Sequence, residues 1–278
     1  MIENMLRTAP LHMTISIYED RFLLIYCCVV ALLFGAALGS FLNCAAWRIA
    51  RGESFLTGRS RCPQCAHVLG ARDLVPVFSW LFLRGRCRYC GARVPARYPL
   101  TEGVFALLTL ACLLRFDLTL LCARNLIFLC CLFCLSLVDL EESFIPNGCL
   151  LIPAAVWGAT APFLGMGWGS AGRHLLAAVI LGGGILLVSL VMDRILGRET
   201  LGGGDIKLFA LVGLYLGLVG SLFTLFFSCI LGLLSALVLR RGAGQPFPFG
   251  PAIAAATAAM LLFGDGLVAW YLGFLSFL

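Results

Sequence analysis

The sequence predicts an all-α membrane protein, a polytopic bundle of about eight membrane-spanning helices with one polar, cysteine-containing loop. Hydrophobic residues make up 61% of the 278 residues and charged residues only 12%. Soluble domains are about half apolar and a quarter charged. The mean hydropathy is +1.00, and several apolar stretches approach the ~20 residues that a helix needs to cross a bilayer. These observations exclude an ordinary soluble domain.

Apolar stretches divide the chain into the predicted spans. The first is longer than the apolar part of a secretory signal, so we expect a retained first span. The stretch 206–239 is too long for one crossing, and we expect a turn near Gly220 and Ser221 to divide it. No sequence repeat with a period of 20–50 residues is visible. The predicted spans are 22–46, 100–116, 118–138, 148–168, 174–192, 206–220, 221–239 and 250–277.

Positive charge sets the expected orientation. The net charge is +6, and ten arginines lie in the loop 47–99 against only Glu53 and Asp73. In a membrane protein this imbalance marks a cytoplasmic loop rather than a nucleic-acid partner, which we do not expect. Alternating spans then place the N-terminus outside the cytoplasmic (inner) membrane. The chain is thereby divided into residues 1–46 with the first span, the loop 47–99, and a bundle of about seven spans over 100–278.

Four of the fourteen cysteines lie in that loop, in the sequences Cys62-Pro63-Gln64-Cys65 and Cys87-Arg88-Tyr89-Cys90. Two CxxC turns direct four thiolates to one point, which suits tetrahedral Zn²⁺, although the gap between the pairs is slightly long. Redox-active pairs or unligated thiols are the alternatives, and a cytoplasmic location argues against stable disulfides. Four thiolates leave no open coordination position, so we expect a structural zinc site. The arginines around it would contact anionic lipid headgroups.

The other cysteines have a simpler explanation. Seven lie inside apolar runs, where a free cysteine behaves as a small hydrophobic residue, and we interpret them as packing residues. They are Cys27, Cys28, Cys112, Cys130, Cys131, Cys134 and Cys229.

Two aspartates at span ends are candidates for catalysis. Asp139 closes the third predicted span and Asp205 opens the sixth, after Gly202-Gly203-Gly204. A helix N-cap at Asp205 and a solvated charge at Asp139 are the structural alternatives. Two carboxylates that share a proton across a water can hydrolyse a peptide, since the ionised one takes the water's proton and the protonated one polarises the scissile carbonyl. Glycines before Asp205 would let a substrate backbone approach it closely.

At this point six motifs carry a resemblance to the type IV prepilin peptidase family, membrane aspartyl proteases of the GxGD type. The order of the motifs follows the family over most of the chain. They are Gly39-Ser40-Phe41-Leu42-Asn43, the two cysteine pairs, Arg97-Tyr98-Pro99-Leu100-Thr101-Glu102, the segment from Val138-Asp139 to Pro146-Asn147, Gly202-Gly203-Gly204-Asp205-Ile206-Lys207, and Pro248-Phe249-Gly250-Pro251. The resemblance implies that Asp139 and Asp205 are catalytic.

The resemblance also bears on the residues around the aspartates. Glu141 and Asn147 stand where the family usually has further aspartates, so we expect substrate recognition or pH dependence to differ from the family's. Glu141 and Glu142 are expected to attract a basic leader. Lys207, the single lysine, is expected to hold Asp205 ionised, to contact substrate or to anchor the helix. Glu102 is either a first-turn acid favoured by the helix dipole or, as the resemblance implies, a residue that recognises a substrate amine or supports the site. Pro251 is equally explained as a helix-start proline.

By resemblance, the chain would remove the leader from prepilin or pseudopilin precursors of type IV pili or type II secretion. It would then N-methylate the new terminus with S-adenosylmethionine. No GxGxxG follows a strand, so the S-adenosylmethionine site stays unknown. A protease-only member is the main alternative. A zinc-loop scaffold without chemistry and a transporter that uses intramembrane aspartates are weaker ones, since the transporter would predict repeats or further midplane charges.

Overall fold

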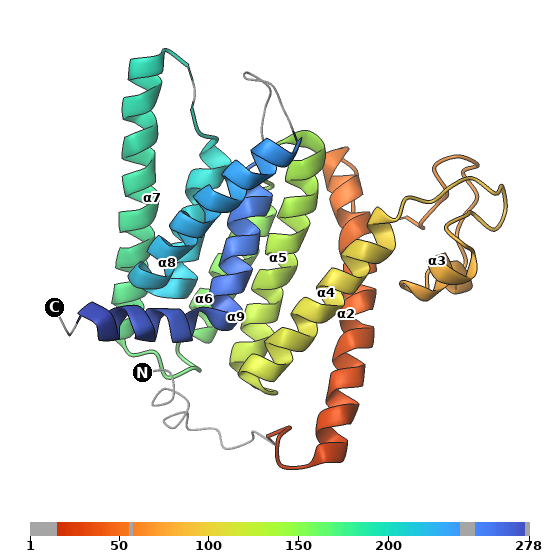
Figure 1. Ribbon diagram of the computed structural model, residues 1–278, viewed down its shortest axis with the longest axis horizontal. Coiled ribbons are helices and arrows are strands. Elements are labelled where there is room, and N and C mark those ends of the chain that lie inside the picture. The colour runs from red at the N-terminus through yellow and green to blue at the C-terminus, as the bar shows by residue number, and fades with distance from the viewer. Residues whose placement is uncertain (1–15, 56–57, 199, 240–247, 276–278) are drawn as a thin grey trace. The chain divides into compact units, whose positions relative to one another are not determined.

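The computed structural model describes residues 16–55, 58–198, 200–239 and 248–275. Over these ranges the regular secondary structure is helical, with two isolated β-bridges and no strand. The chain divides into two compact units, Thr14–Leu137 and Val138–Leu278. Figure 1 shows the course of the ribbon through both units. The predicted all-α class is confirmed.

In the first unit, α2 (Arg21–Ala50) packs closely on α4 (Arg97–Phe116). A Cβ at Gly39 would lie only 3.0 Å from the Cα of Glu102, so the helices need glycine there to approach each other. The side-chain amide of Asn43 donates to Thr101 Oγ1 at 2.7 Å. The motif at 39–43 therefore meets the motif at 97–102, and together they hold the two helices.

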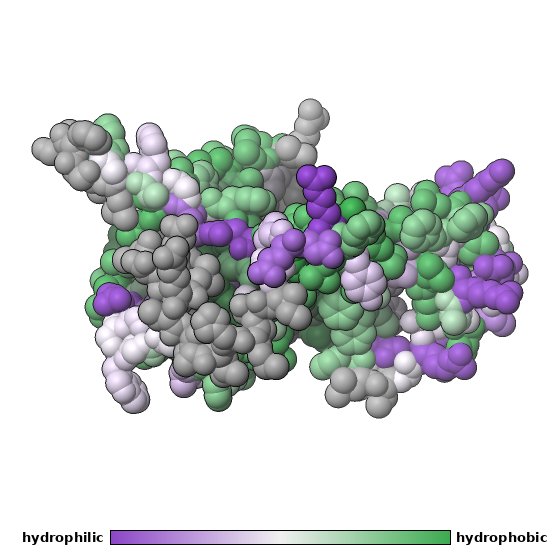
Figure 2. All heavy atoms as spheres, turned by 90° about the horizontal axis from the view of Figure 1, so that it is seen from below, coloured by the Kyte–Doolittle hydropathy of each residue, from purple (hydrophilic) through white to green (hydrophobic). Residues whose placement is uncertain are grey.

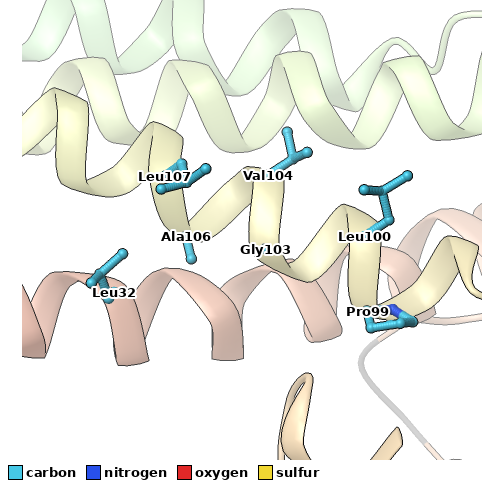
Figure 3. A pocket seen from close by; sticks show the side chains of 7 residues that line it. All are labelled: Leu32, Pro99, Leu100, Gly103, Val104, Ala106 and Leu107. Atoms are coloured by element: carbon cyan, nitrogen blue, oxygen red, sulfur yellow. The ribbon is translucent and has the colours of Figure 1, made fainter. Parts of the chain in front are cut away.

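An apolar hollow of about 410 Å³ lies on this helix pair (Figure 3). Its lining is Leu32 of α2 with Pro99, Leu100, Gly103, Val104, Ala106 and Leu107 of α4. None of these residues has a polar side chain, so the hollow offers no group for catalysis or metal binding.

The helices α4 and α5 (Leu120–Glu142) are joined by a short turn at 117–119. Asp117 ends α4 with φ of 56°. Thr119 then starts α5 as its N-cap, because its hydroxyl oxygen accepts the N–H of Cys122 at 3.2 Å and so satisfies a backbone donor of the first turn. The two helices thus form a tight hairpin.

The long loop between α2 and α4 contains the 3₁₀ turn η1 (Ala71–Asp73) and the short helix α3 (Phe78–Phe82).

The second unit holds the end of α5 with α6 (Gly148–Thr160), α7 (Trp168–Leu196), α8 (Gly203–Leu239) and α9 (Gly250–Leu275). Close packing of α7 on α8 depends on small residues. A Cβ at Gly182 would lie 2.8 Å from the Cβ of Ala210, and one at Gly213 would lie 2.8 Å from the carbonyl oxygen of Ala177. Contacts this short allow backbones to approach as they do in membrane bundles.

The break in α8 lies at Gly217, where φ is 67° and ψ is −177°. This backbone conformation is open to glycine and strained for other residues. The predicted turn near Gly220 and Ser221 is therefore present but three residues earlier. In Figure 1 the ribbon of α8 turns back at its lower end.

Eight helical segments correspond to the eight predicted spans when α8 is divided at Gly217. Six helices of the described residues are long and apolar enough to cross a membrane: α2, α4, α5, α7, α8 and α9. The helix α6 has 13 residues, about 20 Å at 1.5 Å per residue, and is shorter than the bilayer core. Its predicted range of 148–168 was too long, because the helix ends at Thr160.

Apolar side chains cover much of the helix surfaces, as expected for lipid contact. Figure 2 shows hydrophobic residues over much of the described surface in that view, interrupted in several places by hydrophilic residues. Among the exposed apolar side chains, Phe22 is 84% exposed and Trp168 is 96% exposed.

Candidate active site and metal centre

Asp139 lies in the last turn of α5, and its side chain is buried, with 5% of the residue exposed. Its Oδ2 accepts the backbone N–H of Gly250 at 2.9 Å. Gly250 is the first residue of α9, so the positive end of a helix dipole faces the carboxylate. Asp139 is therefore not the solvated span-end charge that was the structural alternative.

The sequence Pro248-Phe249-Gly250-Pro251 supplies this contact. A Cβ at Gly250 would lie 2.8 Å from Asp139 Oδ2 and 3.2 Å from its Cγ, so no larger residue fits without displacing the carboxylate. Pro251 has no N–H to compete for the acceptor, and its position near the helix start confirms the expected helix-start proline. Sequence reasoning treated this motif only as part of a resemblance and missed the contact.

Asp205 is the third residue of α8, and it is half-buried. It is not the N-cap that was the structural alternative, because the helix begins before it. The charge of Asp139 acts electrostatically on Asp205. The two predicted catalytic residues thus lie in one unit and close enough for their charges to interact.

The segment that follows α5, a few residues after Asp139, packs on the start of α8, which carries Asp205. A Cβ at Gly204 would lie 2.9 Å from the Cβ of Ile145. Lys207 Nζ donates to Asn147 Oδ1 at 3.1 Å. The first turn of α8 is therefore packed on residues 145–147, only a few positions after Asp139 in the chain.

The three glycines before Asp205 have different surroundings. At position 204 the chain needs glycine because a Cβ there would be too close to Ile145, and not only because a substrate backbone would approach. A Cβ at Gly203 would have no neighbour within 4 Å, and one at Gly202 would meet only Asp205 Oδ2, at 3.4 Å. Open space for a substrate backbone is thus found at Gly202 and Gly203. Glu141, in the last turn of α5, is half-buried.

Glu102 belongs to the first unit and has a different environment. It is the sixth residue of α4, outside the first turn, so the predicted helix-dipole explanation was wrong. The residue is buried, and its Oε2 accepts the N–H of Val77 at 2.7 Å. Val77 has φ of 61° and ψ of −53°, and the N–H of Phe78 donates to the Pro76 carbonyl at 2.6 Å. These values describe a classic γ-turn, a rare and strained conformation, which Glu102 holds.

The four predicted zinc ligands lie together. The Sγ atoms of Cys62, Cys65, Cys87 and Cys90 are all within 4.8 Å of one another. A Zn–S distance of about 2.3 Å in a tetrahedron requires S–S separations of about 3.8 Å, and the Sγ atoms of Cys62 and Cys90 are 3.9 Å apart. The N–H groups of Cys65 and, less strongly, Gln64 lower the pKa of the Cys62 thiol to about 7, which favours the thiolate that a metal needs. The residues fit Zn²⁺.

The two CxxC segments share one backbone pattern. The N–H of Cys62 donates to the His67 carbonyl at 3.0 Å, and the N–H of Cys87 donates to the Ala92 carbonyl at 2.8 Å. The positions 61–68 and 86–93 are thus related by an offset of 86 − 61 = 25 residues, and a β-bridge joins the ends of each segment. The two segments share only an arginine and the cysteine pair at equivalent positions, so the backbone pattern recurs although no repeat is visible in the sequence. Gly91, directly after the second pair, has φ of 71°, a backbone conformation that favours glycine.

Asp73 of η1 is bonded to the second of these segments. Residues 61–93, which contain both segments, are called the cysteine ribbon below. Asp73 Oδ1 accepts from Arg88 Nε at 2.7 Å and Asp73 Oδ2 accepts from the Tyr89 hydroxyl at 2.9 Å. The Arg88 guanidinium is the main reason that the pKa of Asp73 is lowered. The rings of His67 and Tyr89 lie 3.6 Å apart. Sequence reasoning missed this role, although Asp73 is the single acidic residue between the cysteine pairs.

Comparison with known proteins gives the family. The sequence profile described as the Type IV leader peptidase family matches residues 126–237, and that of the Bacterial Peptidase A24 N-terminal domain matches residues 33–116. A Prepilin leader peptidase/N-methyltransferase of Bacillus subtilis (strain 168) is 34% identical over 247 residues, 87% of this chain and 97% of the relative. The chain belongs to the type IV leader peptidase family.

Other family members have the same name. The protein from Aeromonas hydrophila is 36% identical over 225 residues, 79% of this chain and 76% of the relative. The protein from Dichelobacter nodosus is 31% identical over 259 residues, 84% of this chain and 90% of the relative. No solved structure matches the chain. The family predicted from the six motifs is confirmed. The two matched regions contain the cysteine ribbon and both aspartates, whereas Gly250 lies beyond them.

Proposed function

We propose that this family member is an aspartyl endopeptidase that removes the leader from prepilin or pseudopilin precursors, with Asp139 and Asp205 as its catalytic pair. Membership of an enzyme family and the names of its relatives support this activity. The observation that carries the assignment of residues is the contact of Gly250 with a buried Asp139 beside Asp205.

The surroundings of each carboxyl group suggest its part in hydrolysis. Asp139 accepts an N–H at a helix N-terminus, where a charged carboxylate is favoured. Two neighbouring carboxyl groups do not readily ionise together, so Asp205 keeps the shared proton. Asp139 then takes a proton from water as the water oxygen attacks the scissile carbonyl carbon, and Asp205 donates its proton to the carbonyl oxygen.

Collapse of the tetrahedral intermediate completes the reaction. Asp139 gives its proton to the leaving nitrogen, and Asp205 takes back the proton from the hydroxyl that becomes the new carboxyl group. The C–N bond breaks and the mature chain leaves with a free amine. The open space at Gly202 and Gly203 would admit the substrate backbone next to Asp205.

We further propose that the enzyme N-methylates this amine. The methyl donor would be S-adenosylmethionine, which supplies an electrophilic methyl group when bound. The relatives are named for both activities. The cysteine ribbon, whose four thiolates would hold a structural Zn²⁺, is the region that we propose supports this second step.

The proposed location is the inner membrane, with the ribbon and both aspartates at the cytoplasmic face. The apolar helices support a multi-pass membrane protein. The ten arginines of residues 47–99 support the orientation, because cytoplasmic loops carry an excess of positive charge. These arginines would also contact anionic lipid.

The test is cleavage of a purified prepilin by the purified enzyme. Asp139→Asn and Asp205→Asn should each abolish cleavage while the protein stays folded. Asp193→Asn is the matched control, because Asp193 also lies at a helix end and its side-chain oxygen accepts from Thr200, which an amide can still do. Retained cleavage in either catalytic variant would refute the pair. Labelled S-adenosylmethionine in the same reaction reports methylation, and cleavage without label would indicate a protease-only member.

A further inference from the structure

Two cysteines that sequence reasoning did not connect face each other across the α4–α5 hairpin. The Sγ atoms of Cys112 and Cys122 are 3.9 Å apart. Each Sγ also lies 3.7 Å from the backbone carbonyl oxygen of the other residue. Cys112 was interpreted as a packing residue, but these reciprocal contacts make it one half of a thiol pair.

The turn between the helices fixes the pair. The N–H of Cys122 donates to the N-cap hydroxyl of Thr119, so its place in the first turn of α5 is set. Asp117 ends α4, and its Oδ1 accepts the N–H groups of Leu118 at 2.7 Å and Ile17 at 3.2 Å. Because both helix ends are tied to a turn of three residues, the two thiols have little freedom to separate.

The geometry is close to that of a disulfide. A disulfide has an S–S distance of about 2.05 Å, so the sulfur atoms must approach by about 1.9 Å. A side-chain rotation of each cysteine can provide much of that change, without separating the helices. The two residues come from adjoining helices of one unit.

The position of the pair decides which redox environment it meets. The pair lies near the Phe116 end of α4, and the cysteine ribbon precedes the Arg97 end. If α4 crosses the membrane with the ribbon in the cytoplasm, the pair lies toward the outer face, where disulfides persist. This inference rests on the orientation given under the proposed function. The four ribbon thiols would stay reduced in the cytoplasm and hold metal.

We propose that Cys112 and Cys122 form a disulfide by exchange with a protein disulfide of the outer compartment. The thiolate of Cys122, the more accessible of the two, attacks the oxidant's S–S bond and forms a mixed disulfide, releasing one thiolate. The thiolate of Cys112 then attacks the Cys122 sulfur and releases the second. Two protons and two electrons leave the pair, and the oxidant becomes a dithiol. The product locks the outer end of the hairpin.

The test measures the thiols of the full-length protein in cells. Cells are quenched with acid, the protein is denatured and treated with N-ethylmaleimide, and peptides are identified by mass spectrometry without reductant. We expect a linked Cys112–Cys122 peptide in most chains. Cys112→Ser should remove it, and Cys27→Ser, a change in α2, should leave it unchanged. In a second arm, purified protein is reduced and then oxidised with glutathione disulfide, and the same link should form.

Two outcomes would overturn the proposal. One is alkylation of both thiols in the cell samples, and the other is a link from Cys112 to Cys130 in place of Cys122. Two further measurements distinguish failure of the disulfide from failure of the proposed function or of the orientation. They are prepilin cleavage by the same preparations and maleimide labelling of a Leu118→Cys variant in intact cells. Normal cleavage with outside labelling but no link refutes the thiol pair, whereas labelling only after cell lysis refutes the orientation on which it rests.

Discussion

Replacement of Gly250 by alanine should disturb the carboxylate of Asp139, the proposed catalytic residue. The added Cβ would lie 2.8 Å from Asp139 Oδ2, so either α9 or the carboxylate must move. The displacement would break the 2.9 Å bond from the Gly250 N–H to a buried group. A hydrogen bond to a charged group is worth about 1.5–3 kcal/mol, and each 1.4 kcal/mol changes a rate about tenfold. We therefore expect kcat for leader removal to fall about 10- to 100-fold.

The assay follows leader removal from a prepilin over time, with enzyme in detergent and substrate above KM. Gly184→Ala is the matched control, since Gly184 lies in α7, away from both aspartates in the sequence, and a Cβ there has no neighbour within 4 Å. It should keep kcat within about twofold, as expected for a change that alters no contact. Size-exclusion chromatography and thermal unfolding establish that both variants are folded. Wild-type kcat in Gly250→Ala, measured beside an inactive Asp139→Asn, would refute the role of this N–H.

Three further changes test the rest of the site. Gly204→Ala should lower cleavage because its Cβ would meet Ile145 at 2.9 Å, and the double variant Gly204→Ala with Ile145→Ala should recover most of the activity if packing is the cause. Glu102→Gln should leave cleavage near wild type and increase proteolytic nicking near Val77, since a neutral amide holds the strained turn less well. A rise in the KM for prepilin without new nicking would instead support recognition of a substrate amine. Cys62→Ser should reduce the bound zinc, measured by mass spectrometry, from about one to near zero per chain, and the cysteine ribbon should unfold. Unchanged zinc content would exclude the four-cysteine site.

The sequence was sufficient for features that depend on local composition and spacing. Apolar length predicted the helices because a membrane span must be long and continuous. The CxxC spacing predicted that the four cysteines lie together, where they could hold a metal, because two such turns converge over a short range of chain. The six ordered motifs identified the family. The break in α8 was expected at Gly220 and lies at Gly217, since several glycines in one helix allow a turn and only the packing around them selects one.

Only the tertiary structure decided which distant residues meet. Gly250 donates to Asp139 across 111 positions, and no local pattern predicts a contact of that kind. Glu102 was expected to serve a helix dipole or a substrate, whereas its carboxylate holds the γ-turn at Val77. Cys112 looked like a packing residue until the hairpin placed it opposite Cys122.

The length of the apolar stretches and the spacing of the motifs thus determine the helices, the candidate metal ligands and the family in this protein. They do so because they reflect whether each segment contacts lipid, water or a metal. The assignments of individual polar groups depend on packing between helices. A buried carboxylate or thiol takes its chemistry from the few atoms that surround it, and those atoms come from parts of the chain that the sequence does not place together.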